Sequence, residues 1–281
     1  MILAIDIGGT KIKYAYMDSI ETIQRHEIDT NLKKPSDLVK LVTSLVKDKP
    51  IEKISISIPG FVDDKGYLHR AGAIKSLDEI NVKALLASHL SIPVYIENDA
   101  KCAAFAELHY GSGKDINSFV MLTLGTGVGG AIVIDRHVLK GVGFRAGELG
   151  MMLSKHEGRF TSLHQLASTS ALLTFYNRQK QTNIKDARLI LQEYQTDTLT
   201  QSIVDDWADY VAMSIFNMSS ILNPERVLLG GGISENELLL PIINKALSRI
   251  EEWSVFKADV SVCTFQNNAG LIGAYAKAVN E

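Results

Sequence analysis

The chain of 281 residues is long enough for two domains of ordinary size, and its 46% hydrophobic content supports sizeable cores. A formal net charge of −3 gives no sign of electrostatic attraction to nucleic acid or to an anionic membrane surface. No apolar run approaches membrane-spanning length, and no basic, apolar leader precedes the first strand, so we expect a cytoplasmic protein without nucleic-acid or membrane partners. Cys102 and Cys263 lie far apart in apolar surroundings and are expected to be buried free thiols.

The first part of the chain alternates short strands with helices. Two apolar strands, Ile2–Ile7 and Lys11–Met17, flank a glycine-containing turn and predict a hairpin. From Pro35 onward apolar residues fall at helical spacing, and Lys53–Ile58 alternates isoleucine with serine before Pro59 ends the strand. The other elements expected here are a strand at Thr22–Ile28, a helix at Val82–Leu90, a strand at Val94–Glu97 and a helix at Ala100–Tyr110.

The second part begins with another hairpin, Met121–Asp135, followed by the glycine-rich and irregular stretch Gly141–Gly150. Beyond it we expect helices at Ser162–Gln179, Asp186–Tyr194, Thr200–Leu222, Glu237–Glu252 and Ala269–Val279, and strands at Arg226–Leu229 and Val260–Phe265. Hairpins followed by alternating helix and strand, twice over, predict two α/β domains with mixed sheets. We expect the domains to meet in a cleft, where ligands of α/β proteins usually bind.

The two hairpins, Ala4–Asp18 and Met121–Asp135, resemble each other. Each consists of an apolar strand, a Gly/Thr turn, a second apolar strand and an aspartate. Such turns are either ordinary tight hairpins or nests of backbone N–H groups that bind phosphate. Two related copies favour a duplicated fold with a nucleotide between its halves. Neither copy has the spacing of the usual mononucleotide or dinucleotide loops.

Polar residues at strand ends and in loops are the candidates for chemistry. Asp99 follows a strand and precedes a helix, so it is either the helix N-cap or a base facing a cleft, and Asn98 beside it can hydrogen-bond a hydroxyl-rich ligand. Asp6 lies inside a strand, where Mg²⁺ or a water shell is a candidate to compensate a buried charge. Lys11 either neutralises phosphate or extends into solvent. Glu148 is either a solvated carboxylate or an acceptor for sugar hydroxyls.

Seven short motifs follow one another along the whole chain. They are Asp6–Lys11, Ile58–Gly60, Glu97–Ala100, Leu124–Gly130, Gly147–Gly150, Leu229–Gly232 and Asn268–Ala274. Together they resemble the ROK family of sugar kinases and repressors, which belongs to the hexokinase–actin superfamily. The resemblance implies a two-domain, actin-like ATPase fold, a duplicated ribonuclease H-like unit with a cleft between the domains. We expect one domain at 1–116, completed by the helix 268–281, and a larger one at 117–267.

The same resemblance implies a role for each motif. Asp99 would be the catalytic base, and Gly60, Asn98 and Glu148 would contact the sugar. The resemblance implies that the phosphates are held by Asp6, Gly8, Gly9, Thr10 and Lys11 together with Gly125, Thr126 and Gly127, and the adenosine by Gly230, Gly231 and Gly232. ATP and Mg²⁺ are the implied cofactors, with Asp6 acting on Mg²⁺ through water.

Two further expectations depend on the family. ROK repressors carry a helix-turn-helix ahead of the first hairpin, whereas this sequence begins at that hairpin, so a kinase is expected. A homodimer is expected only because the family is often dimeric.

The chain departs from the family pattern in two places. ROK kinases usually read Glu-x-Gly-His, but here Met151 follows Glu148-Leu149-Gly150. The usual cysteine-rich zinc motif is replaced by 156–164, which contains no cysteine. Two histidines alone cannot complete a four-ligand zinc site, so we expect no structural zinc and propose that Phe160, Leu163 and Leu166 organise the loop by packing.

These departures bear on the substrate. In the family, His and Glu bind O1 and O2 of the sugar, and their places are taken here by Met151 and, in our alignment, His164. A sugar with a substituted O1 loses no partner there, and its aglycone can lie on Met151. The sequences Phe144–Glu148 and Ala71–Ile74 also resemble bacterial β-glucoside kinases.

We therefore expect an ATP-dependent kinase acting on the 6-hydroxyl of a hexose unit, most favourably in β-glucosides such as cellobiose. Glucokinase and N-acetylmannosamine kinase activities stay open, as does a kinase for another small metabolite. The alternative from another class is a non-catalytic, sugar-sensing regulatory ROK protein.

Overall fold

The computed structural model describes residues 1–21 and 23–280 and places the first hairpin at the centre of a five-stranded sheet. Its strands run in the order β3-β2-β1-β4-β8. The hairpin strands β1 and β2 pair antiparallel, as do β2 and β3, whereas β1, β4 and β8 are mutually parallel. The strand bounds are β1 Ile2–Ile7, β2 Lys11–Met17, β3 His26–Asp29, β4 Lys53–Ile58 and β8 Val94–Asn98.

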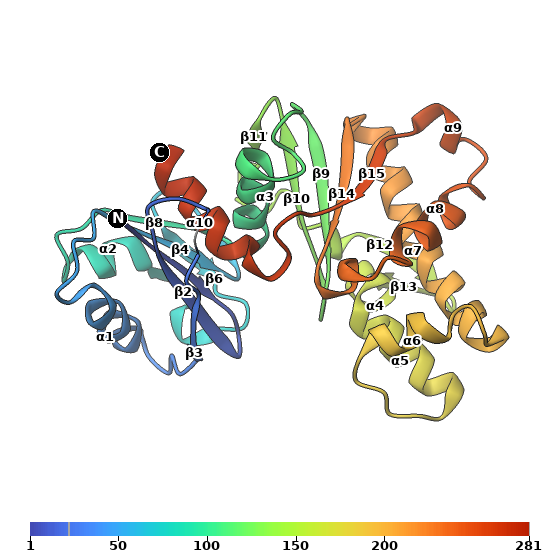
Figure 1. Ribbon diagram of the computed structural model, residues 1–281, viewed down its shortest axis with the longest axis horizontal. Helices are drawn as coiled ribbons and strands as arrows, with labels where there is room; N and C mark the ends of the chain where they lie inside the picture. Colours follow the sequence, from blue (N-terminus) through green and yellow to red (C-terminus); the bar gives the residue numbers. More distant parts are fainter. Residues whose placement is uncertain (22, 281) are drawn as a thin grey trace. The chain divides into compact units, whose positions relative to one another are not determined.

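The alternation of side chains along β1 gives this sheet two different buried faces. Leu3, Ile5 and Ile7 join the core formed with α1 (Pro35–Val46) and α2 (Val82–Ala87). On the opposite face, small residues such as Ala4 lie in a cluster with residues of α3 and α10. These two helices, Asp99–Tyr110 and Ala269–Asn280, pack side by side (Figure 1). Because α10 also contacts β1, the end of the chain lies against its beginning.

A second five-stranded sheet repeats this plan. Its order is β11-β10-β9-β14-β15, with β9 and β10 antiparallel and β9, β14 and β15 mutually parallel. Hairpin, parallel partners and strand order therefore correspond one to one with the first sheet, which confirms the duplicated fold. The strand bounds are β9 Phe119–Leu124, β10 Val128–Ile134, β11 His137–Val138, β14 Arg226–Gly230 and β15 Asp259–Val262.

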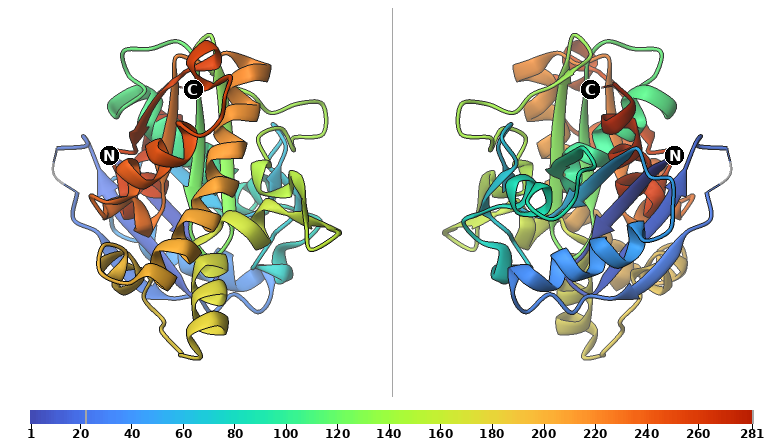
Figure 2. Two further views of the ribbon diagram at one scale, coloured as in Figure 1. Left: turned by 90° about the vertical axis from the view of Figure 1, so that its right-hand side faces the viewer. Right: turned by 90° about the vertical axis from the view of Figure 1, so that its left-hand side faces the viewer.

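Helices cover one face of the second sheet, as the yellow and orange ribbons in Figure 2 show. Val120 and Leu122 of β9 join their core, and the fully buried Trp207 of the longest helix donates its indole N–H to the Ser168 carbonyl at 3.1 Å. Buried aromatic and aliphatic side chains of this kind dominate the stability of a core. The helix bounds are α4 Leu163–Ala167, α5 Thr169–Lys180, α6 Ala187–Glu193, α7 Thr198–Leu222, α8 Leu239–Leu247 and α9 Trp253–Phe256.

Several short elements carry no clear periodicity and were not predicted. In the described part of the chain, two small sheets, β5-β6-β7 and β12-β13, and four 3₁₀ turns lie among the larger elements. Their bounds are β5 Phe61–Val62, β6 Tyr67–Arg70, β7 Ile80–Asn81, β12 Leu153–His156, β13 Arg159–Ser162, η1 Lys75–Leu77, η2 Leu149–Met151, η3 Gly232–Glu235 and η4 Gln266–Asn268.

The chain separates into two compact units, each containing one of the five-stranded sheets. The first consists of Met1–Gly111, Lys140–Ala146 and the C-terminal segment from Asn267 onward, and the second of Ser112–Leu139 and Gly147–Gln266. Within the described residues, no helix is both long enough and apolar enough to cross a membrane.

Three predicted elements need correction. The predicted helix Ser162–Gln179 is two helices, because Ser168 is extended and its side chain caps α5 by accepting the Ala171 N–H. The helix predicted at Glu237–Glu252 is observed only as α8, Leu239–Leu247, because turn bonds to residues three back follow it; α9 begins at Trp253, beyond the predicted range. The strand predicted at Thr22–Ile28 is observed only at His26–Asp29, and Thr22 itself lies outside the described residues.

Candidate active site

In the first unit, four predicted site residues lie near the carboxyl ends of the parallel strands β1, β4 and β8. Asp6 is the penultimate residue of β1, Gly60 follows β4, and Asn98 ends β8 just before Asp99. Ligands of α/β proteins typically bind at this edge of a sheet. The sequence separation of these residues is large, so it is the parallel pairing that brings them to one edge.

Asp6 is compensated by neighbouring side chains. Its Oδ1 accepts a hydrogen bond from Ser57 Oγ at 2.7 Å, and its Oδ2 lies 3.7 Å from Lys13 Nζ. A Cβ added to Gly270, at the start of α10, would lie 2.4 Å from the Asp6 carboxylate, so glycine allows the helix to approach this group. The carboxylate remains 18% exposed. Water can therefore reach it, which a water-mediated magnesium contact requires.

The turn of the first hairpin is closed by its own backbone. Gly8 N–H donates to the Lys11 carbonyl at 2.9 Å, and Thr30 Oγ1 donates to the Gly8 carbonyl at 2.7 Å. Gly9 and Thr10 are exposed at the tip. Lys11 Nζ lies 2.8 Å from the Asp29 carboxylate on the paired strand β3. This hydrogen bond raises the pKa of Lys11, so the side chain stays cationic.

Asn98, and not Asp99, is the N-cap of α3. Its Oδ1 accepts the Lys101 N–H at 3.0 Å, while Asp99 is already the first residue of the helix. Asn98 Nδ2 donates to Asp99 Oδ1 at 3.0 Å and to the Gly60 carbonyl at 2.9 Å. The Ala100 N–H also donates to Asp99 Oδ1, at 2.8 Å. Asp99 is thus an exposed carboxylate held at a helix N-terminus.

Gly60 has a specific backbone reason to be glycine. Its φ is +118°, and a Cβ there would lie 1.7 Å from the Arg70 carbonyl oxygen. Only glycine fits this close approach. Because the Gly60 carbonyl accepts from Asn98, the turn after β4 also orients the side chain that contacts Asp99.

In the second unit, the turn Gly125-Thr126-Gly127 is held in a similar way. Gly125 N–H donates to the Gly127 carbonyl at 2.9 Å, and the Ser170 N–H of α5 donates to the Gly125 carbonyl at 3.3 Å. Thr126 is exposed at the tip. The two predicted phosphate turns therefore share one local design, a glycine N–H bonded across the turn.

His164 packs against this second turn. Its Nδ1 accepts the backbone N–H of Val128, the first residue of β10, at 2.7 Å. A Cβ on Gly127 would lie 2.7 Å from Nδ1, and one on Gly150 would lie 2.6 Å from Cε1. Since Nδ1 is an acceptor, the neutral ring carries its proton on Nε2. The imidazole therefore joins the turn to the Gly147–Gly150 loop.

The loop that carries Glu148 is pressed against β10 by its neighbours. Gly147 has a φ of +84°, and a Cβ on Gly150 would lie 2.1 Å from the Val128 carbonyl oxygen. Glu148 itself is half-buried at the start of a short 3₁₀ turn, and Met151 at the end of that turn is 58% exposed. An exposed thioether side chain next to a carboxylate offers apolar surface to a ligand.

Gly230 is the last residue of β14, and Gly231 and Gly232 follow it directly. Gly231 has a φ of +92°, and a Cβ there would lie 2.2 Å from the Leu124 carbonyl oxygen at the end of β9. Gly232 has open space where a side chain would be, and it is exposed. The glycines thus leave backbone accessible to a flat ligand.

The region that replaces the zinc motif is organised mainly by packing. Leu163 and Leu166 are buried as expected, but Phe160 is 78% exposed at the β12–β13 hairpin and does not pack as we predicted. His156 Nδ1 is 2.7 Å from the Tyr210 hydroxyl. Throughout residues 1–21 and 23–280, no group of three or more His, Cys, Asp or Glu side chains could hold a metal ion. The absence of structural zinc remains a prediction.

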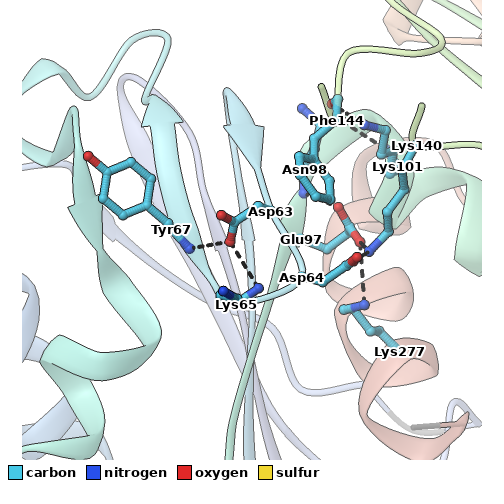
Figure 3. A network of polar contacts seen from close by, with 10 residues as sticks. All are labelled: Asp63, Asp64, Lys65, Tyr67, Glu97, Asn98, Lys101, Lys140, Phe144 and Lys277. Atoms are coloured by element: carbon cyan, nitrogen blue, oxygen red, sulfur yellow. Dashed lines mark hydrogen bonds and ion pairs between the residues drawn. The ribbon is translucent and has the colours of Figure 1, made fainter. Parts of the chain in front are cut away.

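A buried charge network behind Asn98 was not predicted (Figure 3). Glu97, next to Asn98 on β8, is 1% exposed, and its Oε2 lies 3.1 Å from Lys140 Nζ and 3.3 Å from Lys277 Nζ. Lys101 of α3 is also buried and donates from Nζ to the Phe144 carbonyl at 2.8 Å. Lysine in the alanine-rich segments of α3 and α10 is the sequence signal that could have revealed it, because lysine is almost never fully buried without a partner.

Proteins of known sequence and structure resemble this chain over almost its full length. A β-glucoside kinase of Klebsiella pneumoniae is 30% identical over 97% of this chain and 94% of its own length. A ROK family protein of Streptococcus pneumoniae TIGR4, solved in complex with sucrose, superposes with a TM-score of 0.90 at 26% identity, covering 99% of this chain and 98% of that one. A ROK family glucokinase of Streptomyces griseus, solved with glucose and AMPPNP, gives 0.80 at 25% identity, covering 100% and 99%.

The family match extends over the whole described fold. Residues 2–281 match the sequence pattern of the ROK family. The duplicated sheets, the two glycine turns and the loop carrying Glu148 all lie inside that match. This chain therefore belongs to the ROK family.

Proposed function

We propose that this protein transfers the γ-phosphoryl group of ATP to the 6-hydroxyl of a hexose unit, with β-glucosides such as cellobiose as its preferred substrates. The chain is a carbohydrate kinase of the ROK family. The observation that carries the proposal is the carboxylate of Asp99, held at the carboxyl end of β8 by Asn98 within the unit that also contains the first glycine turn. The family match and the kinases among its relatives support it.

Asp99 is the proposed base. Asn98 Nδ2 and the Ala100 N–H both donate to Oδ1, which fixes the plane of the carboxylate. A carboxylate so oriented can accept the proton of a sugar hydroxyl as the new P–O bond forms. Gly60, Asn98 and Glu148 are the proposed sugar contacts. Much of the catalysis of phosphoryl transfer is positioning and charge stabilisation, so these contacts matter as much as the base.

The glycine turns are the proposed nucleotide contacts. The proposed phosphate contacts are Gly8, Gly9, Thr10, Lys11, Gly125, Thr126 and Gly127, and the proposed adenosine contacts are Gly230, Gly231 and Gly232. Backbone N–H groups of such turns bind phosphate without a large side chain in the way. The Streptomyces griseus relative was solved with AMPPNP, an ATP analogue, which supports ATP as the phosphoryl donor.

The surroundings of Asp6 fit a water-mediated magnesium ion. Mg²⁺ usually keeps several waters and binds through one or two carboxylates plus substrate phosphates. Asp6 supplies one partly exposed carboxylate, and Ser57 orients it through Oδ1. Bound Mg²⁺ would neutralise charge on the β- and γ-phosphates, while Asp6 would hold its water shell.

The substrate preference rests on Met151 and His164. Because His164 Nδ1 already accepts the Val128 N–H, the ring presents a donor at Nε2 where a family carboxylate would present acceptors. Met151 offers exposed apolar surface. A free hexose would lose partners at O1, each worth about 0.5–1.5 kcal/mol, whereas a glycoside has no O1 hydroxyl to lose. The Streptococcus pneumoniae relative was solved in complex with sucrose, a disaccharide, which supports the proposal that the substrate carries a second sugar.

Glucokinase and N-acetylmannosamine kinase activities are the alternatives within the family, since curated relatives of both kinds match this chain. The alternative from another class is a non-catalytic sugar sensor. A coupled ADP-release assay across a panel of β-glucosides, hexoses and N-acetylhexosamines separates these functions. We expect sugar-dependent ADP release well above the rate without sugar. Sugar binding by calorimetry with no ADP release on any sugar would instead establish the sensor.

A further inference from the structure

The segment Lys140–Ala146, which we call the strap, belongs to the first unit although its neighbours in sequence belong to the second. Within the strap, Ala146 N–H donates to the Lys140 carbonyl at 3.0 Å and Phe144 N–H to the Gly141 carbonyl at 3.2 Å. The strap ends one residue before Gly147, and Glu148 follows. Along the chain, the strap therefore leads directly into the loop that carries a proposed sugar contact.

Two buried side chains, Glu97 of β8 and Lys101 of α3, hold the strap. Lys140 Nζ lies 3.1 Å from Glu97 Oε2, and Lys101 Nζ donates to the Phe144 carbonyl at 2.8 Å (Figure 3). Burial lowers the pKa of Lys140, but the charge of Glu97 and the hydrogen bond to Asp64 outweigh burial and raise it overall. Lys140 is therefore cationic at neutral pH, and its attachment to Glu97 is an ion pair.

Glu97 also touches the residue that holds the proposed base. Its Oε1 accepts the Asn98 N–H at 2.9 Å, while Asn98 Nδ2 donates to Asp99 Oδ1. A single buried carboxylate thus contacts the strap through one oxygen and the Asn98–Asp99 turn through the other. Lys277 of α10, 3.3 Å from Oε2, adds a second cation. Removing one partner of a buried ion pair leaves the remaining charge uncompensated and is strongly unfavourable.

We propose that Glu97 is a positioning residue, which orients the Asn98–Asp99 turn and docks the strap that leads to Glu148. The inference rests on the proposed function, because it takes Asp99 and Glu148 to be site residues. Glu97 does not contact the reacting atoms. Its charge is needed because a neutral side chain of the same shape would keep the bond to Asn98 but lose the ion pairs with Lys140 and Lys277.

The first test compares Glu97→Gln with a matched control, Asp64→Asn. Asp64 Oδ1 also lies 2.6 Å from Lys140 Nζ, but the Asp64 side chain is 70% exposed. The Asn98 N–H donates to Glu97 and not to Asp64. We expect Glu97→Gln to lower kcat on the order of 10²-fold, because small misplacements of catalytic groups have effects of this size, with the sugar Kd within about threefold. We expect Asp64→Asn to stay within about threefold in both. Equal losses in the two variants would show that the carboxylates merely neutralise Lys140 and would overturn the proposal.

The second test is chemical rescue. A cavity of about 270 Å³ borders Lys140 and Lys277, so Glu97→Ala opens space next to a small polar chamber. We expect acetate to raise kcat of Glu97→Ala at least tenfold in a saturable way. Acetamide, which is neutral and of similar size, should have no effect, and neither compound should change Glu97→Gln, whose side chain fills the space. Rescue by acetamide as well as by acetate would show that volume, and not charge, is what Glu97 supplies.

A measurement without turnover separates this proposal from the proposed function. Amide hydrogen exchange of Phe144 and Ala146 should be at least tenfold faster in Glu97→Gln than in the unmodified protein, and unchanged in Asp64→Asn. Unchanged exchange in Glu97→Gln would overturn the docking role even if the enzyme is active. If the unmodified protein releases no ADP with any sugar, while strap exchange is still faster in Glu97→Gln, the kinase assignment alone is overturned.

Discussion

Replacing Asp99 by asparagine should reduce turnover by about 10² to 10⁴-fold, the usual contribution of a positioned general base. Asparagine has the same shape and can still accept the N–H groups of Asn98 and Ala100 through its Oδ1. The fold and the sugar affinity should therefore be retained. The measurement is kcat from ADP release, beside the sugar Kd from calorimetry.

The control for this experiment is Asp64→Asn, which makes the same chemical change at an exposed aspartate of the same unit. Its kcat should remain within about threefold of the unmodified protein, since surface substitutions of this kind have small effects. Turnover near that of the unmodified protein in Asp99→Asn would reject Asp99 as the base.

The largest effect on stability is expected at Gly273 in α10. A Cβ there would lie 1.7 Å from the Cys102 carbonyl oxygen and 2.2 Å from its carbonyl carbon, both in the backbone of α3. No rotamer change can relieve a clash with backbone, so Gly273→Ala must push the two helices apart. We expect a loss of about 3 kcal/mol in the free energy of unfolding, at the upper end for overpacked sites.

Urea denaturation measures this loss, with Gly232→Ala as the matched control, because nothing lies within 4 Å of a Cβ at Gly232. The control should change the free energy of unfolding by less than about 0.5 kcal/mol. If Gly273→Ala were equally mild, the close approach of α3 and α10 would not be the reason for glycine at this position.

The duplicated architecture could be predicted from sequence because its signals are local. The bounds of β1, β2 and β4 follow from alternation and from the turn residues beside them, and the structure confirms all three. The break at Ser168 was missed because helical periodicity continues on both sides of it. What interrupts the helix is a side-chain cap, and a serine inside a periodic run can equally face solvent.

The site was predictable to a smaller extent, because only some of its residues have a local signal in the sequence. Gly60 and the Asn98–Asp99 turn could be placed at strand ends because strand ends are visible in sequence. Which of two adjacent residues caps α3 depends on backbone angles, and here Asn98 is the cap. Lysines in the alanine-rich segments could have indicated a buried charge, but the partners of the strap could not be predicted, because these contacts join residues more than 40 positions apart.

The substrate assignment is tested by kcat/KM for cellobiose, glucose and N-acetylmannosamine under identical conditions. We expect phosphorylation of every accepted sugar to depend on ATP. We expect cellobiose to be preferred, because Met151 and His164 leave the O1 end without the usual partners. A preference of tenfold or more for either monosaccharide, about 1.4 kcal/mol of transition-state stabilisation, would contradict the assignment of β-glucosides as substrates.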